Sequence, residues 1–245
     1  MTTQGPCIEV QGLSVYYGDK EAIRDIDLSL PEGKIIGIMG PNGSGKTTLL
    51  KCMTGLLKPS SGGIKAFGKP LISQRSQISY IPQKDQVDWD FPLSIRDLVQ
   101  MSLYRHVRWY QKLSDKLIKK GDEAIDSMGL TDIQHTQIGE LSGGQQQRAF
   151  IARALASNAN ILLLDEPFTG IDAKTTDDLI RIFQTLKNEG KTIVLVHHDL
   201  ANAKSFLDHV VLLKKTVLKS GEASDVLNSP ELVKAYGFSF QPCRN

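Results

Sequence analysis

One segment of the sequence has the residue types and spacing of a phosphate-binding loop. Residues 40–47 read Gly-Pro-Asn-Gly-Ser-Gly-Lys-Thr and match the pattern G-x-x-x-x-G-K-[ST] in full. Glycines let backbone N–H groups turn inward around phosphate oxygens, and a helix that starts at the loop points its positive end at them. Lys46 is placed to reach the β- and γ-phosphates, and the Thr47 hydroxyl is a ligand for Mg²⁺. The residues predicted to contact the nucleotide here are Gly40, Pro41, Asn42, Gly43, Ser44, Gly45, Lys46, Thr47 and Thr48.

The segments on either side of this loop support the same interpretation. Residues 34–39 form a short apolar run typical of a strand buried in a parallel sheet, and Leu49, Leu50 and Met53 give the next segment an apolar helical face. The alternative is a glycine-rich turn that matches the pattern by chance, and the two flanks argue against it. The sequence therefore predicts an ATP site with Mg²⁺ as cofactor.

Two adjacent carboxylates follow a second apolar run. Residues 161–164 are Ile-Leu-Leu-Leu, and Asp165 and Glu166 come directly after them. Ligands of open α/β sheets gather beyond the carboxyl ends of the strands. Asp165 is the candidate to hold Mg²⁺ through water, and Glu166 is the candidate general base for the attacking water. A strand end that merely meets solvent is the alternative, but the phosphate loop in the same chain favours the catalytic interpretation.

A second glycine-rich helix start lies at residues 141–145, Leu-Ser-Gly-Gly-Gln, before a predicted helix at residues 149–156. Backbone N–H groups and the Ser142 hydroxyl at such a start can bind another anion, and a simple helix cap is the alternative. The segment resembles the signature sequence of ATP-binding cassette (ABC) proteins. In that family the signature comes from another subunit, which implies an ATP-sandwich homodimer. The resemblance adds to the predicted nucleotide-binding residues Ser142, Gly143, Gly144 and Gln145.

The resemblance also assigns roles to a glutamine and an aspartate. Gln83 is similar to the family glutamine that senses Mg²⁺ and the attacking water and links the core to a helical subdomain. It is therefore predicted as a catalytic residue and as a metal ligand, together with Thr47 and Asp165. Residues 169–172 read Thr-Gly-Ile-Asp where the family more often has Ser-Ala-Leu-Asp, and Asp172 is the member retained. The difference from the family sequence is conservative, and the resemblance implies that it bears only on details of the dimer contact.

Two adjacent histidines, His197 and His198, follow an apolar run at residues 192–196. The family has a switch histidine immediately before an aspartate, so the resemblance selects His198, which precedes Asp199, to contact the γ-phosphate and steady the attacking water. His197 is expected to point to the opposite face of the strand. A metal site of His197, His198 and His209 is the alternative, but side chains of adjacent strand residues diverge and no cysteine supports such a site.

Tyr17 resembles the aromatic residue that stacks on adenine in ABC proteins, a contact that tolerates any base because every base has a π-face. Tyr16 is the alternative, and a strand tyrosine more often has a packing role. The resemblance covers nearly the whole chain and includes all of the hydrolytic positions. It therefore implies a competent ATPase with the catalytic residues Glu166, His198, Gln83 and Lys46.

The predicted fold is α/β, with a P-loop NTPase core built on a mainly parallel sheet. Alternating apolar residues predict an N-terminal antiparallel β layer, and a capping box at Ser94 and Asp97 opens an inserted α-helical subdomain. Strands then alternate with helices again, which indicates parallel pairing. The whole of 1–245 is interpreted as a single ABC nucleotide-binding domain. Its parts are the core with its β layer at 1–83 and 158–229, the helical subdomain with the signature at 84–157, and a loosely held tail at 230–245.

Composition sets the broad class. The chain has 245 residues, of which 40% are hydrophobic and 23% charged, which is the ordinary range of globular domains. Cys7, Cys52 and Cys243 are three isolated cysteines without a C-x-x-C pair, which suggests neither a disulfide framework nor a thiolate metal site, so a reducing cytosol is expected. The sequence shows neither a signal peptide nor an apolar stretch long enough to span a membrane, so any membrane association is expected to be peripheral.

The cassette has no coiled coil, zinc insertion or second copy of its motifs, which favours a transporter subunit over a repair or translation factor. It most resembles the separate ATPase of a bacterial-type importer at the cytoplasmic face of the cell membrane. Its expected partners are a second copy of itself, integral membrane permease subunits near residues 85–93, and, indirectly, an extracytoplasmic substrate-binding protein. The sequence Trp-Asp-Phe-Pro at residues 89–92, with residues 166–172, is similar to the branch that imports manganese, zinc or iron. The alternative is that Trp89 and Phe91 simply anchor a surface loop.

Other functions of the predicted ATPase remain as alternatives. A siderophore, cobalamin or other solute is one alternative cargo. A basic stretch with interleaved Trp109 and Tyr110 is compatible with a nucleic-acid face, but a solvated helical face near a membrane is favoured, and no nucleic-acid partner is expected. The basic residues of that stretch are Arg105, Arg108, Lys112, Lys116, Lys119 and Lys120.

Overall fold

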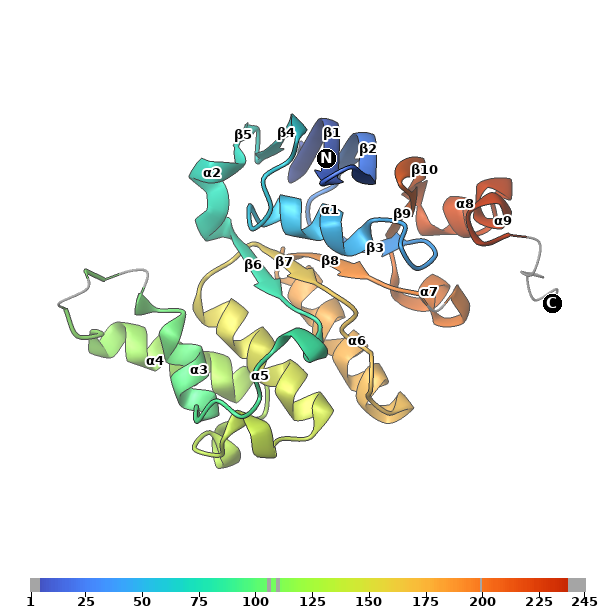
Figure 1. The fold of residues 1–245 in the computed structure, drawn as a ribbon. Helices are drawn as coiled ribbons and strands as arrows, with labels where there is room; N and C mark the ends of the chain where they lie inside the picture. The colour runs from blue at the N-terminus through green and yellow to red at the C-terminus, as the bar shows by residue number, and fades with distance from the viewer. Residues whose placement is uncertain (1–4, 105–106, 109–110, 199, 238–245) are drawn as a thin grey trace.

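The chain folds into two sheets, of which the larger carries the predicted phosphate loop (Figure 1). The structure, a computed structural model, describes residues 5–104, 107–108, 111–198 and 200–237. The larger sheet has the strand order β10-β9-β3-β8-β7-β6. Its neighbours pair in parallel except β10, which is antiparallel to β9, so the predicted mainly parallel sheet is confirmed. The strands are β3 (Ile35–Met39), β6 (Ile78–Ile81), β7 (Ile161–Leu164), β8 (Thr192–Val196), β9 (His209–Lys214) and β10 (Thr216–Glu222).

The smaller sheet is the predicted N-terminal antiparallel layer, with the strand order β2-β1-β4-β5. Alternating apolar residues predict β1 and β2, whose side chains enter the core from one face. The sequence does not predict β4, because Gly62 and Gly63 interrupt the apolar pattern and glycine is rare in strands. The strands are β1 (Ile8–Tyr17), β2 (Lys20–Leu30), β4 (Ser61–Ala66) and β5 (Lys69–Pro70).

Strand β3 separates two apolar clusters, because its side chains alternate between the faces of the sheet. Ile36 and Ile38 pack with β1, β2 and helix α1 (Lys46–Met53), whereas Ile35 and Met39 belong to the cluster on the other face. Helix α1 therefore lies between the two sheets (Figure 1). Burial on both faces explains why β3 is a continuous apolar run rather than an alternating one.

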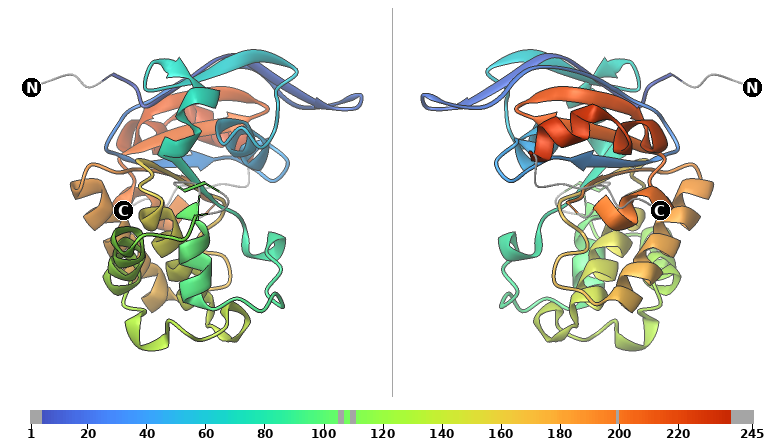
Figure 2. Two further views of the ribbon diagram at one scale, coloured as in Figure 1. Left: turned by 90° about the vertical axis from the view of Figure 1, so that its left-hand side faces the viewer. Right: turned by 90° about the vertical axis from the view of Figure 1, so that its right-hand side faces the viewer.

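A group of helices lies on the opposite side of the larger sheet from the N-terminal layer (Figure 2). One continuous apolar cluster joins this group to the sheet, so the boundary of a separate helical subdomain at residues 84–157 stays a prediction. The helices of the group are α3 (Ile95–Met101), α4 (Asp115–Ser127) and α5 (Gly143–Ala156), with the short turns η2 (Lys84–Gln86), η4 (Thr131–Ile133) and η5 (Ile138–Glu140). Helix α2 (Leu71–Gln74) and η1 (Arg75–Gln77) connect β5 to β6.

The C-terminal part corrects one prediction. Residues 230–236 form helix α9 (Pro230–Tyr236), and its Leu232 and Ala235 are buried, so this part of the expected loose tail is wrong. Residues 238–245 lie outside the described chain. The hairpin of β9 and β10 also has no counterpart in the sequence prediction. The remaining helices are α6 (Ala173–Asn188), α7 (Leu200–Phe206) and α8 (Ala223–Leu227). None of the described helices combines the length and the apolarity that a membrane crossing needs.

Ser94 should contribute measurably to stability through the cap of α3. Its Oγ accepts a hydrogen bond from the Asp97 N–H, and the Asp97 carboxylate accepts one from the Ser94 N–H, so both halves of the predicted capping box are present. Ser94→Ala should lower the free energy of unfolding by about 1 kcal/mol in chemical denaturation. Ser114→Ala is the matched control, because Ser114 precedes α4 without a side-chain cap bond and its loss should have little effect.

Candidate nucleotide site

The loop between β3 and α1 has a backbone that requires its glycines. Gly40 has φ 154°, and a Cβ there would lie 2.0 Å from the carbonyl oxygen of Leu213. Gly45, at φ 98°, precedes α1, and a Cβ there would lie 2.2 Å from the side chain of Ile23. Both positions therefore exclude any side chain on steric grounds, besides favouring glycine for its conformation.

Two polar groups inside the loop are arranged for an anion. Lys46 is only 6% exposed, and its Nζ donates to the carbonyl oxygens of Gly40 at 2.9 Å and Pro41 at 3.0 Å. Burial lowers the pKa of Lys46, while Glu166 and Asp165 partly oppose that shift. The Ser44 hydroxyl is buried without a hydrogen-bond partner among the residues that the structure describes. A phosphate in the loop would give both groups a strong acceptor.

Asp165 lies at the end of β7, next to the first turn of α1. Its Oδ1 accepts a hydrogen bond from the Thr47 hydroxyl at 3.2 Å, and its Oδ2 accepts one from the Tyr80 hydroxyl at 3.4 Å. Burial raises the pKa of Asp165, and the bonds from Thr47 and Tyr80 oppose that rise by favouring the charged form. The structure thus brings the predicted Thr47 and Asp165 together, and it adds Tyr80, which sequence reasoning did not include.

Glu166 occupies a strained backbone position at the mouth of the site. Its φ is 50°, in the left-handed region that side chains other than glycine rarely adopt, and such strain is often found at functional sites. Its Oε2 accepts hydrogen bonds from Gln83 Nε2 at 3.0 Å and from the Thr169 hydroxyl at 3.3 Å. The predicted Gln83 and Glu166 are therefore in direct contact, and Thr169 is an addition.

A cleft of about 450 Å³ lies beside Glu166 and contains the predicted switch histidine. His197 and His198 both line it. His198 is exposed, whereas His197 is buried with its ring 5.5 Å from that of Phe168 and 5.6 Å from that of Phe206. His197 therefore belongs to an aromatic cluster. Asp199 lies outside the described residues. Among the described residues, no three or more His, Cys, Asp or Glu side chains are grouped to hold a metal ion, so the alternative histidine metal site has no support.

The phosphate loop opens into a cleft of about 510 Å³. Tyr17 lines this cleft and Tyr16 does not, which favours Tyr17 for the contact with adenine. Lys215 is a lining residue that the sequence did not reveal. Its N–H donates to the Ser44 carbonyl at 2.9 Å and its carbonyl accepts from the Arg24 N–H at 2.8 Å, so the β9–β10 turn holds the loop. The lining also includes Lys20, Glu21, Ala22, Asn42, Gly43, Ser44, Gly45, Lys46, Thr47, Thr48 and Glu166.

The signature residues form a complete helix start away from this cleft. Ser142 Oγ accepts from the Gln145 N–H at 3.3 Å, and Gln145 Oε1 accepts from the Ser142 N–H at 2.8 Å, which makes a capping box on α5. A Cβ on Gly144 would lie 2.2 Å from Thr175 Cγ2, so the start of α5 packs tightly on α6. Within the described chain, none of the four signature residues lines the cleft beside the phosphate loop.

Asp172 is the N-cap of α6. Its carboxylate accepts hydrogen bonds from the Thr175 N–H at 3.0 Å and from the Thr175 hydroxyl at 2.7 Å, and these bonds lower the pKa of Asp172. The side chain therefore holds the turn between Glu166 and α6 in place. An aspartate directly before a predicted helix is a sequence pattern that is typical of such an N-cap.

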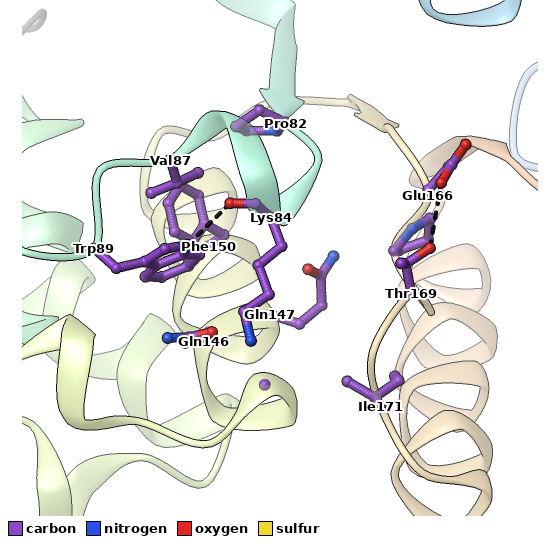
Figure 3. Close-up of a pocket in the computed structure, with 12 residues that line it drawn as sticks. Pro82, Lys84, Val87, Trp89, Gln146, Gln147, Phe150, Glu166, Thr169 and Ile171 are labelled. Atoms are coloured by element: carbon purple, nitrogen blue, oxygen red, sulfur yellow. Dashed lines mark hydrogen bonds between the residues drawn. The ribbon is translucent and has the colours of Figure 1, made fainter.

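A groove runs between the helical group and the turn after β7 (Figure 3). One wall carries Trp89, whose ring meets that of Phe150 edge to face at a centroid distance of 5.7 Å and whose Nε1 donates to the Lys84 carbonyl at 2.9 Å. The other wall carries Glu166, Thr169 and Ile171 (Figure 3). Trp89 thus anchors the loop before α3, whereas nearby Phe91 is 54% exposed.

Comparison with known proteins decides among the families that use a phosphate loop. The family model described as ABC transporter matches residues 23–169. The chain belongs to the ABC transporter family. It is an ATP-binding ATPase subunit of a transporter that also has membrane components, and its fold is that of ABC ATPase domains. The resemblance found in the signature and the phosphate loop is thereby confirmed.

Individual members of the ABC family match this chain over nearly its whole length. The manganese transport system ATP-binding protein MntB of Bacillus subtilis is 42% identical, covering 94% of this chain and 92% of that protein. The zinc transport system ATP-binding protein TroB of Treponema pallidum is 40% identical, covering 94% and 86%. Among solved structures, cbiO1 of Clostridium perfringens, part of the ABC transporter complex cbiONQ, has a TM-score of 0.78 at 27% identity and covers 94% of each chain.

Tyr17→Ala should weaken ATP binding by about tenfold, because stacking of a base on an aromatic ring contributes ~1–3 kcal/mol. Isothermal titration of ATP into the purified chain measures the effect. Tyr16→Ala is the matched control, since Tyr16 is similarly exposed but does not line the cleft. A loss with Tyr16→Ala and none with Tyr17→Ala would reverse the assignment.

Proposed function

We propose that the chain is the ATP-hydrolysing subunit of an importer for a divalent transition metal, namely manganese, zinc or iron. The relatives support this most directly, because proteins 40% and 42% identical are named as zinc and manganese transport ATP-binding proteins. The subunit is peripheral, at the cytoplasmic face of the cell membrane. Integral permease subunits form the path, and an extracytoplasmic substrate-binding protein delivers the metal to them. The imported metal is thus cargo and not a cofactor.

The oxygen atoms beside the phosphate loop fit Mg²⁺ as the cofactor of hydrolysis. The Thr47 hydroxyl and the Asp165 carboxylate lie 3.2 Å apart, and both are oxygen donors of the kind that Mg²⁺ prefers. Thr47 would bind the ion directly and Asp165 through water. Gln83 donates its Nε2 to Glu166, so its amide oxygen remains for the ion or for its water. Mg²⁺ would neutralise charge on the phosphates.

Glu166 is the general base in the proposed reaction. The bonds from Gln83 and Thr169, at 3.0 and 3.3 Å, hold its carboxylate where the two clefts meet. There it accepts the proton of the attacking water, while Lys46 stabilises the charge of the γ-phosphate and His198 steadies the water and the phosphate. Most of the rate acceleration in such a site comes from positioning and electrostatic stabilisation.

Each hydrolytic site is proposed to be completed by a second copy of the chain. The helix start at Ser142 presents N–H groups for an anion, yet it does not line the cleft of its own phosphate loop. In an ATP-sandwich homodimer, residues 142–145 of one copy face the phosphate loop of the other. Asp172 would act at the dimer contact through the turn that it caps.

The permease is proposed to dock at the groove of Figure 3 and the loop before α3. Trp89 and Phe150 form a rigid wall there, and the exposed Phe91 gives an apolar contact beside it. The same groove is bounded by Glu166 and Thr169. Movement of the docked permease can therefore be transmitted to the residues that hold the proposed general base.

Glu166→Gln tests the hydrolytic role. The variant should bind ATP normally but lose turnover by a factor of about 10²–10⁴, because a general base contributes that much. It should also trap an ATP-dependent dimer, detected by size-exclusion chromatography with light scattering. Glu189→Gln, at the exposed end of α6, is the control and should retain the wild-type rate. Undiminished turnover in Glu166→Gln would refute the role.

Stimulation of the assembled transporter tests the cargo. The full complex, purified from membranes and reconstituted, should hydrolyse ATP faster when its binding protein presents one of Mn²⁺, Zn²⁺ or Fe²⁺. Steady-state phosphate release measures this, with the metal-free binding protein as control. Stimulation by a siderophore or cobalamin instead, with none by the three ions, would contradict metal-ion import and leave the ATPase assignment intact.

A further inference from the structure

Strand β6 ends beside the carboxylates that follow β7. The two strands pair in parallel, with Tyr80 opposite Leu163 and Ile81 opposite Leu164. The backbone pairing continues one residue further, because the Asp165 N–H donates to the Ile81 carbonyl at 3.0 Å. The pairing register of β6 and β7 therefore places the side chain of Tyr80 next to Asp165, because the two strands are direct neighbours.

Both the side chain and the main chain of Tyr80 are hydrogen-bonded. Its hydroxyl donates to Asp165 Oδ2 at 3.4 Å, and its carbonyl oxygen accepts a hydrogen bond from Arg153 Nη2 of α5 at 3.0 Å. The Arg153 guanidinium also lies over the ring of Phe150, 4.7 Å from its centroid. The signature helix thus holds the main chain of Tyr80, and the phenol of Tyr80 holds the carboxylate.

The two oxygens of Asp165 are divided between two donors. Thr47 occupies Oδ1 and Tyr80 occupies Oδ2, and these come from α1 and β6. A magnesium ion that takes the Thr47 oxygen as a ligand would remove one of the two restraints on the carboxylate. The bond from Tyr80 would then be the one that keeps the Asp165 side chain from rotating, and bonds to ionised acceptors are the stronger ones.

We propose that Tyr80 is a positioning residue that holds the Asp165 carboxylate in place for Mg²⁺, with its own main chain fixed to the signature helix by Arg153. This inference rests on the proposed role of Asp165 at Mg²⁺. The same strand end leads to Gln83, which donates to Glu166. The end of β6 thus carries one donor for each of the two carboxylates after β7.

Tyr80→Phe in the full chain tests the proposal, since it removes only the hydroxyl. Isothermal titration of ATP is performed at a series of Mg²⁺ concentrations and in EDTA. The gain in ATP affinity on going from EDTA to saturating Mg²⁺ should shrink about 3- to 10-fold, as expected for loss of one hydrogen bond. ATP affinity in EDTA should stay within twofold of wild type. Tyr104→Phe, which alters an exposed tyrosine of the helical group, should change neither value.

Two further variants separate the possible failures. Asp165→Asn should reduce the Mg²⁺-dependent gain in ATP affinity more than Tyr80→Phe does. If Asp165→Asn has no effect, the proposed metal role is itself wrong; if it has the effect and Tyr80→Phe does not, only the inference on Tyr80 is overturned. Arg153→Lys should reduce this gain in the wild-type background and reduce it little further in Tyr80→Phe, because the two act in series. Fully additive shifts would refute the link through Arg153.

Discussion

The nucleotide site depends on a carboxylate that is withdrawn from water and has to stay charged. Asp165 is 2% exposed, and its pKa is raised mainly by burial and also by the neighbouring charge of Glu166. A buried carboxylate is costly unless it is hydrogen-bonded and near a cation. Thr47 and Tyr80 supply the hydrogen bonds, and the buried Lys46 ammonium interacts favourably with the same charge. The phosphate loop, β6 and β7 must therefore be aligned before Asp165 can take the role at Mg²⁺ that is proposed for it.

The order of the strands provides that alignment. Strands β3, β8, β7 and β6 are consecutive neighbours and run in parallel, so their carboxyl ends meet at one edge of the sheet. These ends lead, in that order, to the phosphate loop, the histidine pair, the two carboxylates and Gln83. Each group comes from a distant part of the sequence, yet all reach one edge, as is general for ligand sites of open parallel sheets. Register, more than any single loop, sets the geometry of the site.

Local patterns made part of this arrangement predictable from the sequence. The phosphate loop, the cap at Ser94 and the burial of β3 follow from short-range residue types. The contact of Tyr80 with Asp165 joins residues 85 positions apart, and it depends on the pairing of β6 with β7, which no local pattern specifies. Helix α9 is too short to form on intrinsic propensity and owes its stability to the burial of its apolar face, so the sequence alone indicates a loose tail there.

The helix start at Ser142 is the part of the proposed hydrolytic site that would act on a second copy of the chain. Its capping box uses the Gln145 N–H, but the preceding N–H groups, of Gly143 and Gly144, have no intrahelical partner, as at any helix start. Gly144 must lack a side chain because Thr175 fills that space, so the position of this start is fixed by packing on α6. In the proposed homodimer, this helix start would meet the nucleotide of the other copy, because it does not line the nucleotide cleft of its own chain. Since the Arg153–Tyr80 link ties the same helix to Asp165, binding of that nucleotide would also act on the carboxylate that is proposed to hold Mg²⁺ in its own chain.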